Sequence, residues 1–251
     1  MVTSSHIPTD ATRTAHIILA PKGGIGKSFA AFFLLQLFQK RGYPTFAADT
    51  DPLNQTLQKI TALKATFFNI SPTNHLIDPS VFDGMIESIL ETNGISVIDV
   101  GSSSYLPMMQ YLIENRVPAV LREHGCQLFI HSLLVGNECR DDTILALHDV
   151  LTQLDCPSVV WLNEHFGPVV RDGRGFFESA IYHDHKDRIR GVITLPQRTP
   201  HTYGKDVRQM LERHQTFAEA ITVTPLMTRQ RLTTLFDETL AQFNEIDFSH
   251  A

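Results

Sequence analysis

A glycine-rich segment, Lys22-Gly23-Gly24-Ile25-Gly26-Lys27-Ser28, lies between an apolar run at 16–20 and a helical pattern at 29–39. Glycines let a backbone bend so that several N–H groups converge on phosphate oxygens. A helix that begins there adds its free N–H groups and the positive end of its dipole. Lys27 can then reach the β- and γ-phosphates of a nucleotide, and the Ser28 hydroxyl can hold Mg²⁺. The segment predicts a phosphate cradle; the alternative is a glycine-rich turn that binds nothing.

The segment departs from the usual Walker A pattern, G-x-x-x-x-G-K-[ST], at its beginning. Pro21 stands where that pattern has its first glycine, and an additional lysine, Lys22, precedes the glycine pair. An ordinary phosphate loop does not need this second lysine.

Carboxylates follow two further apolar runs. After residues 45–48 comes Asp49-Thr50-Asp51-Pro52, whose two carboxylates can serve Mg²⁺ and orient an attacking water. Residues 97–98 lead to Asp99 and then Gly101, the arrangement of a Walker B strand whose aspartate contacts Mg²⁺ through water. The alternatives are turn aspartates before a proline and an aspartate that caps a buried strand. Because ligands bind at the carboxyl ends of parallel strands, we expect these carboxylates beside the cradle.

Asn163 ends another apolar run, residues 158–162. Its amide can pair with the donor and acceptor edge of adenine, or it can form a local Asx turn. The guanine-reading sequence Asn-Lys-x-Asp is absent, because Glu164, His165 and Phe166 follow Asn163. These residues favour ATP over GTP.

The motifs require a sheet that brings strand ends together. Apolar runs alternate with helical patterns, which predicts an α/β fold: a single doubly wound, mostly parallel sheet with helices on both faces. We expect residues 1–14 to form a flexible tail and residues 15–251 to form one domain. The expected strands lie near 17–20, 45–48, 66–70, 96–99, 128–134, 159–162 and 192–195. The clearest helices beyond the cradle are expected near 78–94, 141–154 and 228–246.

The amino-acid composition disfavours several classes of protein. With 43% hydrophobic and 19% charged residues, the chain is neither disordered nor membrane-embedded in type. Its three widely spaced cysteines form neither a disulfide framework nor a metal quartet, which favours a reducing, cytoplasmic location. A net charge of −6 argues against a chain-wide grip on nucleic acid. A local basic surface formed by Arg208, Arg213, Arg229 and Arg231 is the alternative, and we expect any DNA binding to be weak.

The segments Lys22–Ser28 and Asp49–Pro52, together with Asp99, resemble the deviant Walker A ATPases of the ParA/MinD family. The family motif is K-G-G-x-G-K-[ST] followed by D-x-D-P. The resemblance implies a P-loop fold, ATP and Mg²⁺ as ligands, and a homodimer in the ATP-bound state. Family members also place the loop after the last strand against the base, which adds Pro196 to Asn163 as an expected base contact.

The resemblance also implies roles for single residues. Lys27 and Ser28 match the P-loop lysine and the Mg²⁺ ligand. Asp51 matches the aspartate that positions the hydrolytic water. Asp49 matches a position close to Mg²⁺, and Asp99 matches the Walker B residue.

Lys22 matches the signature lysine, which in that family reaches the nucleotide of a partner subunit. Lys22 and Lys27 are too close in sequence for both side chains to grip the same phosphates easily from one compact loop. If Lys22 instead extends across a two-fold axis to the nucleotide of a second subunit, the crowding is removed; such an arrangement predicts a closed dimer. The alternative is a solvated lysine beside the loop, since exposed lysines are common.

Other segments point to one branch of the family. Leu53-Asn54 replaces the Gln-Gly that often follows D-x-D-P in partition ATPases. The segments 161–163, 167–168, 203–206 and 227–232 are instead similar to a branch that conjugative plasmids encode, with a plasmid-stability relative. This similarity implies a Mg²⁺-dependent ATPase in plasmid transfer or stability, slow without another plasmid-encoded protein. The alternatives are an ATP-binding switch with negligible hydrolysis and a P-loop phosphotransferase, which would need an acceptor pocket and a lid.

Overall fold

The structure, a computed structural model, describes residues 13–52, 54–70, 78–136 and 138–248. Seven strands form one sheet in the order β3-β2-β4-β1-β5-β6-β9, and every neighbouring pair is parallel. The predicted α/β fold with a parallel sheet is confirmed. Its strands are β1 (Arg13–Leu19), β2 (Thr45–Asp49), β3 (Thr66–Phe67), β4 (Ile95–Asp99), β5 (Cys126–Val135), β6 (Ser158–Asn163) and β9 (Ile189–Leu195).

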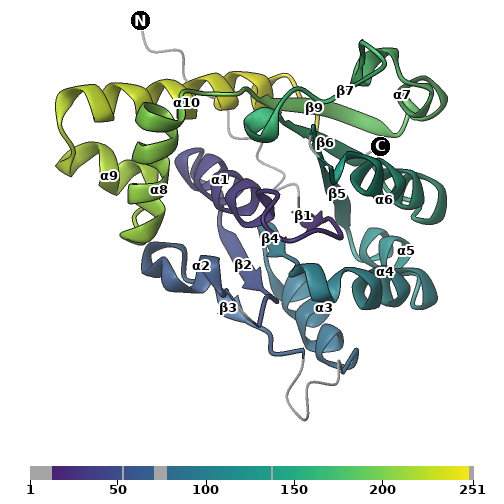
Figure 1. The fold of residues 1–251 in the computed structure, drawn as a ribbon. Coiled ribbons are helices and arrows are strands. Elements are labelled where there is room, and N and C mark those ends of the chain that lie inside the picture. Colours follow the sequence, from purple (N-terminus) through teal and green to yellow (C-terminus); the bar gives the residue numbers. More distant parts are fainter. Residues whose placement is uncertain (1–12, 53, 71–77, 137, 249–251) are drawn as a thin grey trace, which may run out of the picture.

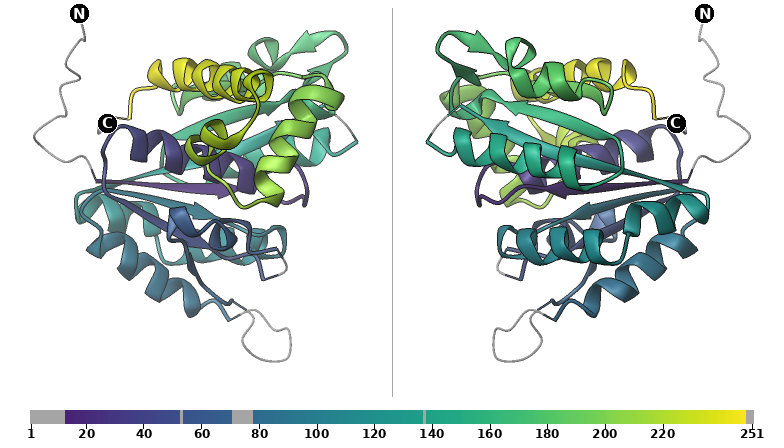
Figure 2. Two further views of the ribbon diagram at one scale, coloured as in Figure 1. Left: turned by 90° about the vertical axis from the view of Figure 1, so that its left-hand side faces the viewer. Right: turned by 90° about the vertical axis from the view of Figure 1, so that its right-hand side faces the viewer.

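Helices cover both faces of the sheet (Figure 1 and Figure 2). The face with α1 also carries α8, α9 and α10, and the opposite face carries α3, α4, α5 and α6. None of the described helices is long and apolar enough to span a membrane. The helices are α1 (Lys27–Lys40), α2 (Thr56–Lys59), α3 (Val81–Glu91), α4 (Tyr105–Glu114), α5 (Val117–Glu123), α6 (Arg140–Gln153), α7 (Ala180–His185), α8 (Lys205–Glu212), α9 (Phe217–Val223) and α10 (Leu226–Asn244).

Both faces of β1 are buried, which explains why its sequence is a continuous apolar run. Ile18 packs in the cluster that contains α1 and α10, whereas Ile17 and Leu19 pack in the cluster that contains α3 and α4. The last helix docks on the first of these clusters, where the ring of Phe236 stacks on Phe33 with centroids 5.0 Å apart. The core therefore lies in two layers, one on each side of the sheet.

Several strands have bounds that differ from the expected ones, and β1 and β3 are two of them. Arg13 and Thr14, which we assigned to the tail, belong to β1, because this strand stays in register with β5 as far as Arg13 and Cys126. The Arg13 side chain also donates hydrogen bonds to the carbonyls of Thr92 and His124. The edge strand β3 is shorter than expected, since it pairs only with the last two residues of β2. Residues 1–12 of the expected tail lie outside the described residues.

The helices α2, α4, α5, α7, α8 and α9 were not located from the sequence, nor was a small antiparallel ribbon of β7 (Val170–Arg171) and β8 (Arg174–Gly175). The order of the strands indicates where in the sheet the expected site lies. The chain leaves β1 through α1 on one face to reach β2, and it leaves β4 through α4 and α5 on the other face to reach β5. Such a reversal opens a crevice at the carboxyl ends of the central strands.

Candidate functional site

The glycine-rich loop joins β1 to α1 at the carboxyl edge of the sheet. Gly24 and Gly26 have φ values of +72° and +100°, a region that side chains rarely adopt. A Cβ at Gly26 would also lie 2.8 Å from Nδ2 of Asn163. Gly26 is the residue that precedes α1, so the loop delivers the free N–H groups of this helix to the edge of the sheet. The backbone conformation of the loop therefore favours glycine at both positions for steric reasons.

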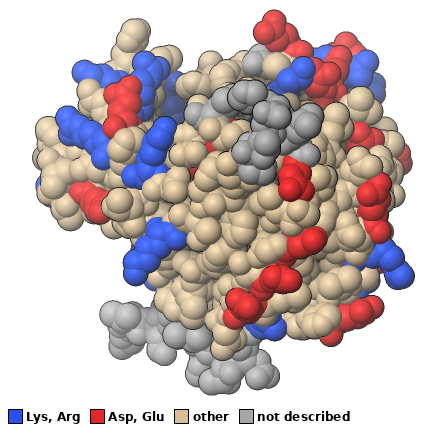
Figure 3. All heavy atoms as spheres, turned by 90° about the horizontal axis from the view of Figure 1, so that it is seen from below, with Lys and Arg blue, Asp and Glu red and all other residues tan. Residues whose placement is uncertain are grey.

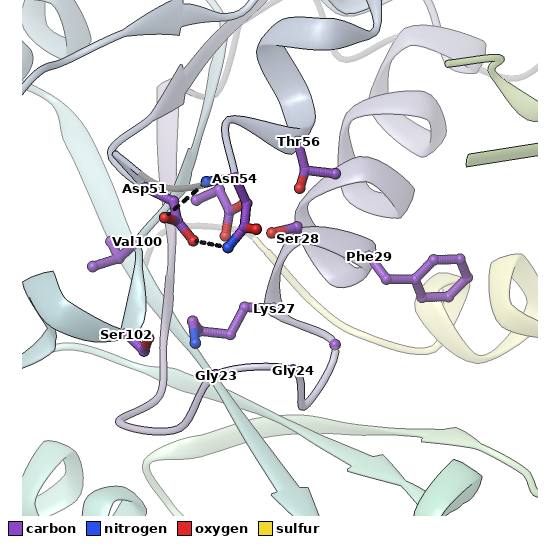
Figure 4. Close-up of a pocket in the computed structure, with 12 residues that line it drawn as sticks. Gly23, Gly24, Lys27, Ser28, Phe29, Asp51, Asn54, Thr56, Val100 and Ser102 are labelled. Carbon is purple, nitrogen blue, oxygen red and sulfur yellow. Dashed lines mark hydrogen bonds between the residues drawn. The ribbon is translucent and has the colours of Figure 1, made fainter. Parts of the chain in front are cut away.

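A pocket of about 320 Å³ lies beside this loop (Figure 4). Lys27 and Ser28 enter it from the first turn of α1, while Asp51 and Ser102 come from the segments that follow β2 and β4. Asp99 also lines the pocket, so the structure brings together Lys27, Ser28, Asp51 and Asp99, the four residues that the sequence predicted for phosphate, Mg²⁺ and water. Its lining residues are Gly23, Gly24, Gly26, Lys27, Ser28, Phe29, Asp51, Asn54, Thr56, Asp99, Val100 and Ser102.

Lys27 is buried and folds back on its own loop. Its Nζ donates a hydrogen bond to the carbonyl of Lys22 at 2.6 Å. Burial lowers the pKa of Lys27, and the charges of Asp99 and Asp51 oppose that shift. The ammonium group thus closes the loop on itself while it faces two carboxylates.

Asp99 lies at the floor of the site and is 1% exposed. Among the described residues, no hydrogen-bond donor satisfies either of its carboxylate oxygens. Burial, followed by the charge of Asp49, raises the pKa of Asp99 to about 7, against the influence of the Ser28 hydroxyl and the Lys27 charge. A buried carboxylate with unsatisfied oxygens beside a serine hydroxyl fits a hard, oxygen-seeking cation such as Mg²⁺.

Asp49 is completely buried, and its carboxylate is engaged with the backbone. One oxygen accepts the N–H of Asp51 at 3.0 Å, and the other accepts the N–H of Leu57 at 3.0 Å. Burial raises its pKa, although these hydrogen bonds oppose the shift. Asp49 therefore holds the segment between β2 and α2, which carries Asp51.

Asp51 accepts two hydrogen bonds from Asn54, one from the backbone N–H at 3.2 Å and one from Nδ2 at 3.0 Å (Figure 4). The backbone of Gly101 packs closely against Asp51, because a Cβ at Gly101 would lie only 2.9 Å from the Cα of Asp51. Asn54 and Thr56 are pocket residues that the sequence patterns did not reveal. Their nearness in sequence to Asp51 was the signal that could have found them.

A second pocket, of about 390 Å³, adjoins the same loop and shares Gly24, Gly26 and Phe29 with the first. Asn163 and Pro196, the expected base contacts, both line it. Two pockets that meet at one phosphate loop suit a ligand with a polar, charged part and a more apolar part. The remaining lining residues are His165, Phe166, Leu195, Arg198, Tyr203, Gly204, Val207, Arg208, Leu211, Glu212 and Leu235.

Lys22 lies outside both sets of lining residues. Its Nζ is 2.8 Å from a carboxylate oxygen of Asp142 on α6. The hydrogen bond and the charge of Asp142 raise the pKa of Lys22. The structure thus places this lysine toward α6 rather than toward the phosphates of its own loop.

Comparisons with known proteins identify the family of this chain. Residues 16–245 match the CobQ/CobB/MinD/ParA nucleotide binding domain. A curated relative from Escherichia coli, Protein TraL, is 36% identical over 231 residues, which cover 90% of this chain and 95% of the relative. A second Protein TraL from Escherichia coli is 37% identical over 221 residues, which cover 86% of this chain and 91% of the relative.

Two solved structures share the fold. The MinC:MinD cell division protein complex of Aquifex aeolicus matches with a TM-score of 0.52 at 12% identity, covering 95% of this chain and 98% of that chain. The MinD cell division protein of Aquifex aeolicus matches with a TM-score of 0.50 at 12% identity, covering 95% of this chain and 100% of that chain. The fold is that of a P-loop NTPase. The chain belongs to the CobQ/CobB/MinD/ParA family of nucleotide-binding domains.

Proposed function

We propose that this protein is a cytoplasmic, Mg²⁺-dependent ATPase that acts as a nucleotide-switched dimer in plasmid transfer or plasmid stability. The observation that supports the ATPase most directly is the convergence of Lys27, Ser28, Asp51 and Asp99 on one pocket at the beginning of α1. The plasmid role rests on the likeness to the two TraL proteins.

In this proposal the triphosphate lies along residues 23–28, where backbone N–H groups and Lys27 neutralise its charge. Ser28 and Asp99 would hold Mg²⁺, with Asp49 close to them in the fold, and the ion would supply positive charge for the β- and γ-phosphates. Asp51 orients a water whose oxygen attacks the γ-phosphorus. The bond from this phosphorus to the β–γ bridging oxygen breaks, and the products are ADP and phosphate.

The base occupies the second pocket, against Asn163 and Pro196. Lys22 then turns away from Asp142 and reaches the phosphates of a second copy, so that each subunit completes the site of the other. A cation supplied in trans can raise the rate of phosphoryl transfer by about 10³–10⁵, by analogy with arginine fingers. The ATP-bound dimer is the form that we expect a second plasmid-encoded protein to recognise.

One observation supports a second candidate, a switch that binds ATP with negligible hydrolysis. Both oxygens of Asp51, the water-orienting group, accept hydrogen bonds from Asn54. A partner protein that displaces Asn54 would remove these two hydrogen bonds from the carboxylate, whereas without that partner the bound ATP would persist. The two candidates differ in turnover and share the same binding site.

DNA is a minor ligand in this proposal. Of the arginines that could form a local basic surface, Arg231 pairs with the buried carboxylate of Asp206 at 2.5 Å. On the face shown in Figure 3, basic side chains predominate at the upper left, acidic side chains predominate on the right, and a broad uncharged area lies between them. We therefore expect DNA binding to be weak, independent of sequence and steeply salt-sensitive.

A phosphate-release assay with Mg²⁺-ATP tests the proposal, with and without DNA and candidate plasmid proteins. Lys27→Ala is expected to lose ATP binding or turnover. The matched control is Lys40→Ala, which changes an exposed lysine at the other end of α1 and is expected to behave like the wild type. Unchanged hydrolysis by Lys27→Ala contradicts the assignment. ATP binding without phosphate release under all of these conditions selects the second candidate.

A further inference from the structure

We infer that Asn163 is a positioning residue for the phosphate loop, in addition to its place in the wall of the second pocket. The inference rests on the proposed function, because it assigns a task in the binding of the triphosphate. It concerns how a loop of glycines acquires one fixed conformation.

Both ends of the Asn163 amide are engaged. Its Nδ2 donates a hydrogen bond to the carbonyl of Ile25 at 2.9 Å, and its Oδ1 accepts the backbone N–H of His165 at 3.2 Å. The side chain is buried, with 6% exposure. A flipped amide would place oxygen against the Ile25 carbonyl and nitrogen against the His165 N–H, so the two partners determine its orientation.

The hydrogen bond to Ile25 controls the neighbouring N–H. The carbonyl of Ile25 and the N–H of Gly26 belong to one planar trans peptide and point in opposite directions. Because Asn163 holds the carbonyl, it turns the Gly26 N–H away from itself. Gly26 lines both pockets and has a φ of +100°, so its own backbone preference does not select this orientation. The hydrogen bond from the Asn163 amide therefore fixes the orientation of the peptide between Ile25 and Gly26.

The strand that carries Asn163 is itself tied to the strand that leads into the loop. Trp161 of β6 is fully buried and donates its indole N–H to Nδ1 of His131 in β5 at 2.9 Å. Nε2 of His131 lies 2.9 Å from Nδ1 of His16 in β1, and Nε2 of His16 lies 2.9 Å from the Thr14 hydroxyl. An indole N–H only donates, so each histidine accepts at Nδ1 and donates at Nε2. Asn163 therefore holds the loop from a rigid frame.

Titration calorimetry tests the inference with two ligands, Mg²⁺ with a non-hydrolysable ATP analogue and Mg²⁺ with inorganic tripolyphosphate, which has no base. Asn163→Ala is expected to weaken the binding of tripolyphosphate about tenfold, because the loop loses a buried hydrogen bond, and to weaken that of the ATP analogue by at least that factor, because the analogue also loses a contact to its base. Asn163→Asp keeps an acceptor for His165 but places a carboxylate against the Ile25 carbonyl, so its loss is expected to be at least as large. Asn115→Ala is the control, since this exposed amide also donates to a backbone carbonyl, that of Tyr111.

Hydrogen exchange adds a readout that general destabilisation would not produce. In Asn163→Ala, residues 20–28 are expected to exchange faster while residues 126–135 of β5 keep the wild-type rate. Tripolyphosphate affinity within twofold of the wild type in both Asn163 variants, with weaker binding of the ATP analogue alone, overturns the inference and leaves the proposed function standing. A wild-type chain that binds neither ligand overturns both.

Discussion

Lys22 and Asp142 form an ion pair within one chain, with Nζ 2.8 Å from the carboxylate, at the rim of the phosphate loop. The side chains are 42% and 53% exposed, so water screens the pair and the lysine can leave it at little cost. The pair links the loop to α6. In the proposed mechanism Lys22 has to break it in order to reach a second subunit.

We predict that Asp142→Asn increases the ATP-dependent dimer fraction by a small factor, about two- to threefold, because it frees Lys22. Sedimentation velocity with Mg²⁺-ATP measures this fraction. Asp141→Asn is the matched control, since Asp141 pairs with Arg140 instead. A smaller dimer fraction in Asp142→Asn than in the control would show that Asp142 supports the dimer rather than holding Lys22 back.

Gly101→Ala is predicted to impair hydrolysis more than binding. The new Cβ would meet the Cα of Asp51 at 2.9 Å and displace the carboxylate that orients water. Displacements of about 1 Å can lower a catalytic rate about 100-fold, so we expect a 10- to 100-fold loss of kcat with a small change in ATP affinity. Steady-state kinetics and calorimetry measure the two quantities.

Gly84→Ala provides the control for that experiment. A Cβ at Gly84 meets no atom within 4 Å, and the residue lies inside α3. Alanine there is expected to leave hydrolysis unchanged and to stabilise the helix by about 1 kcal/mol. Equal kcat for the two glycine variants would remove the assigned role of Gly101.

Asp99 is predicted to make stability pH-dependent in the absence of Mg²⁺. Its pKa is raised from 3.8 to about 7 in the folded state, so the folded chain binds a proton that the unfolded chain releases between these values. Its contribution to stability therefore falls as the pH rises from about 4 to 7. Asp99→Asn should be more stable than the wild type at pH 8, by up to about 4 kcal/mol, and this advantage should shrink toward pH 4. Urea unfolding across this range measures the difference, and a pH-independent difference would contradict it.

The histidine chain is predicted to act with the opposite sign. Burial lowers the pKa of His131 to about 3, and burial and then the charge of His131 lower that of His16. The unfolded chain therefore binds more protons below pH 6.5, and stability falls with acid by about 1.4 kcal/mol per pH unit for each histidine.

His131→Leu tests that chain of hydrogen bonds. It leaves the Trp161 N–H and His16 without their partner, so we expect a loss of about 2–5 kcal/mol at pH 7. Its stability should also fall less steeply between pH 6.5 and 4.5 than that of the wild type. Denaturant unfolding at several pH values measures both quantities. An unchanged pH slope would show that His131 does not stay neutral in the folded chain.

The sequence was sufficient to predict the sheet, because buried parallel strands read as apolar runs, and three of these runs end at polar site residues, Asp49, Asp99 and Asn163. Asp51 and Asp99 could be placed beside the loop for that reason. The hydrogen bond from Asn163 to Ile25 could not, because it joins an amide to a backbone carbonyl 138 residues away and carbonyls have no sequence signature. The ion pair of Lys22 with Asp142 could not be predicted from the sequence either, since any of many acidic residues could have been the partner.

The helices α8 and α9 were missed because they are short; both pack on α10. The first turn of α9 carries a capping box, in which Thr216 and Glu219 exchange hydrogen bonds. This pattern of a threonine followed three residues later by a glutamate was a usable sequence signal. The ribbon of β7 and β8 has only two residues in each strand, too few for an alternating pattern.

The most direct test of the central claim, an ATP-switched dimer with Lys22 acting in trans, is sedimentation velocity of Asp51→Ala at micromolar concentration. This variant lacks the water-orienting carboxylate, so bound Mg²⁺-ATP should persist. We predict a dimer with Mg²⁺-ATP, a monomer with Mg²⁺-ADP, and a monomer with either nucleotide when Lys22→Ala is added. An Asp51→Ala chain that binds Mg²⁺-ATP and remains monomeric would contradict the account.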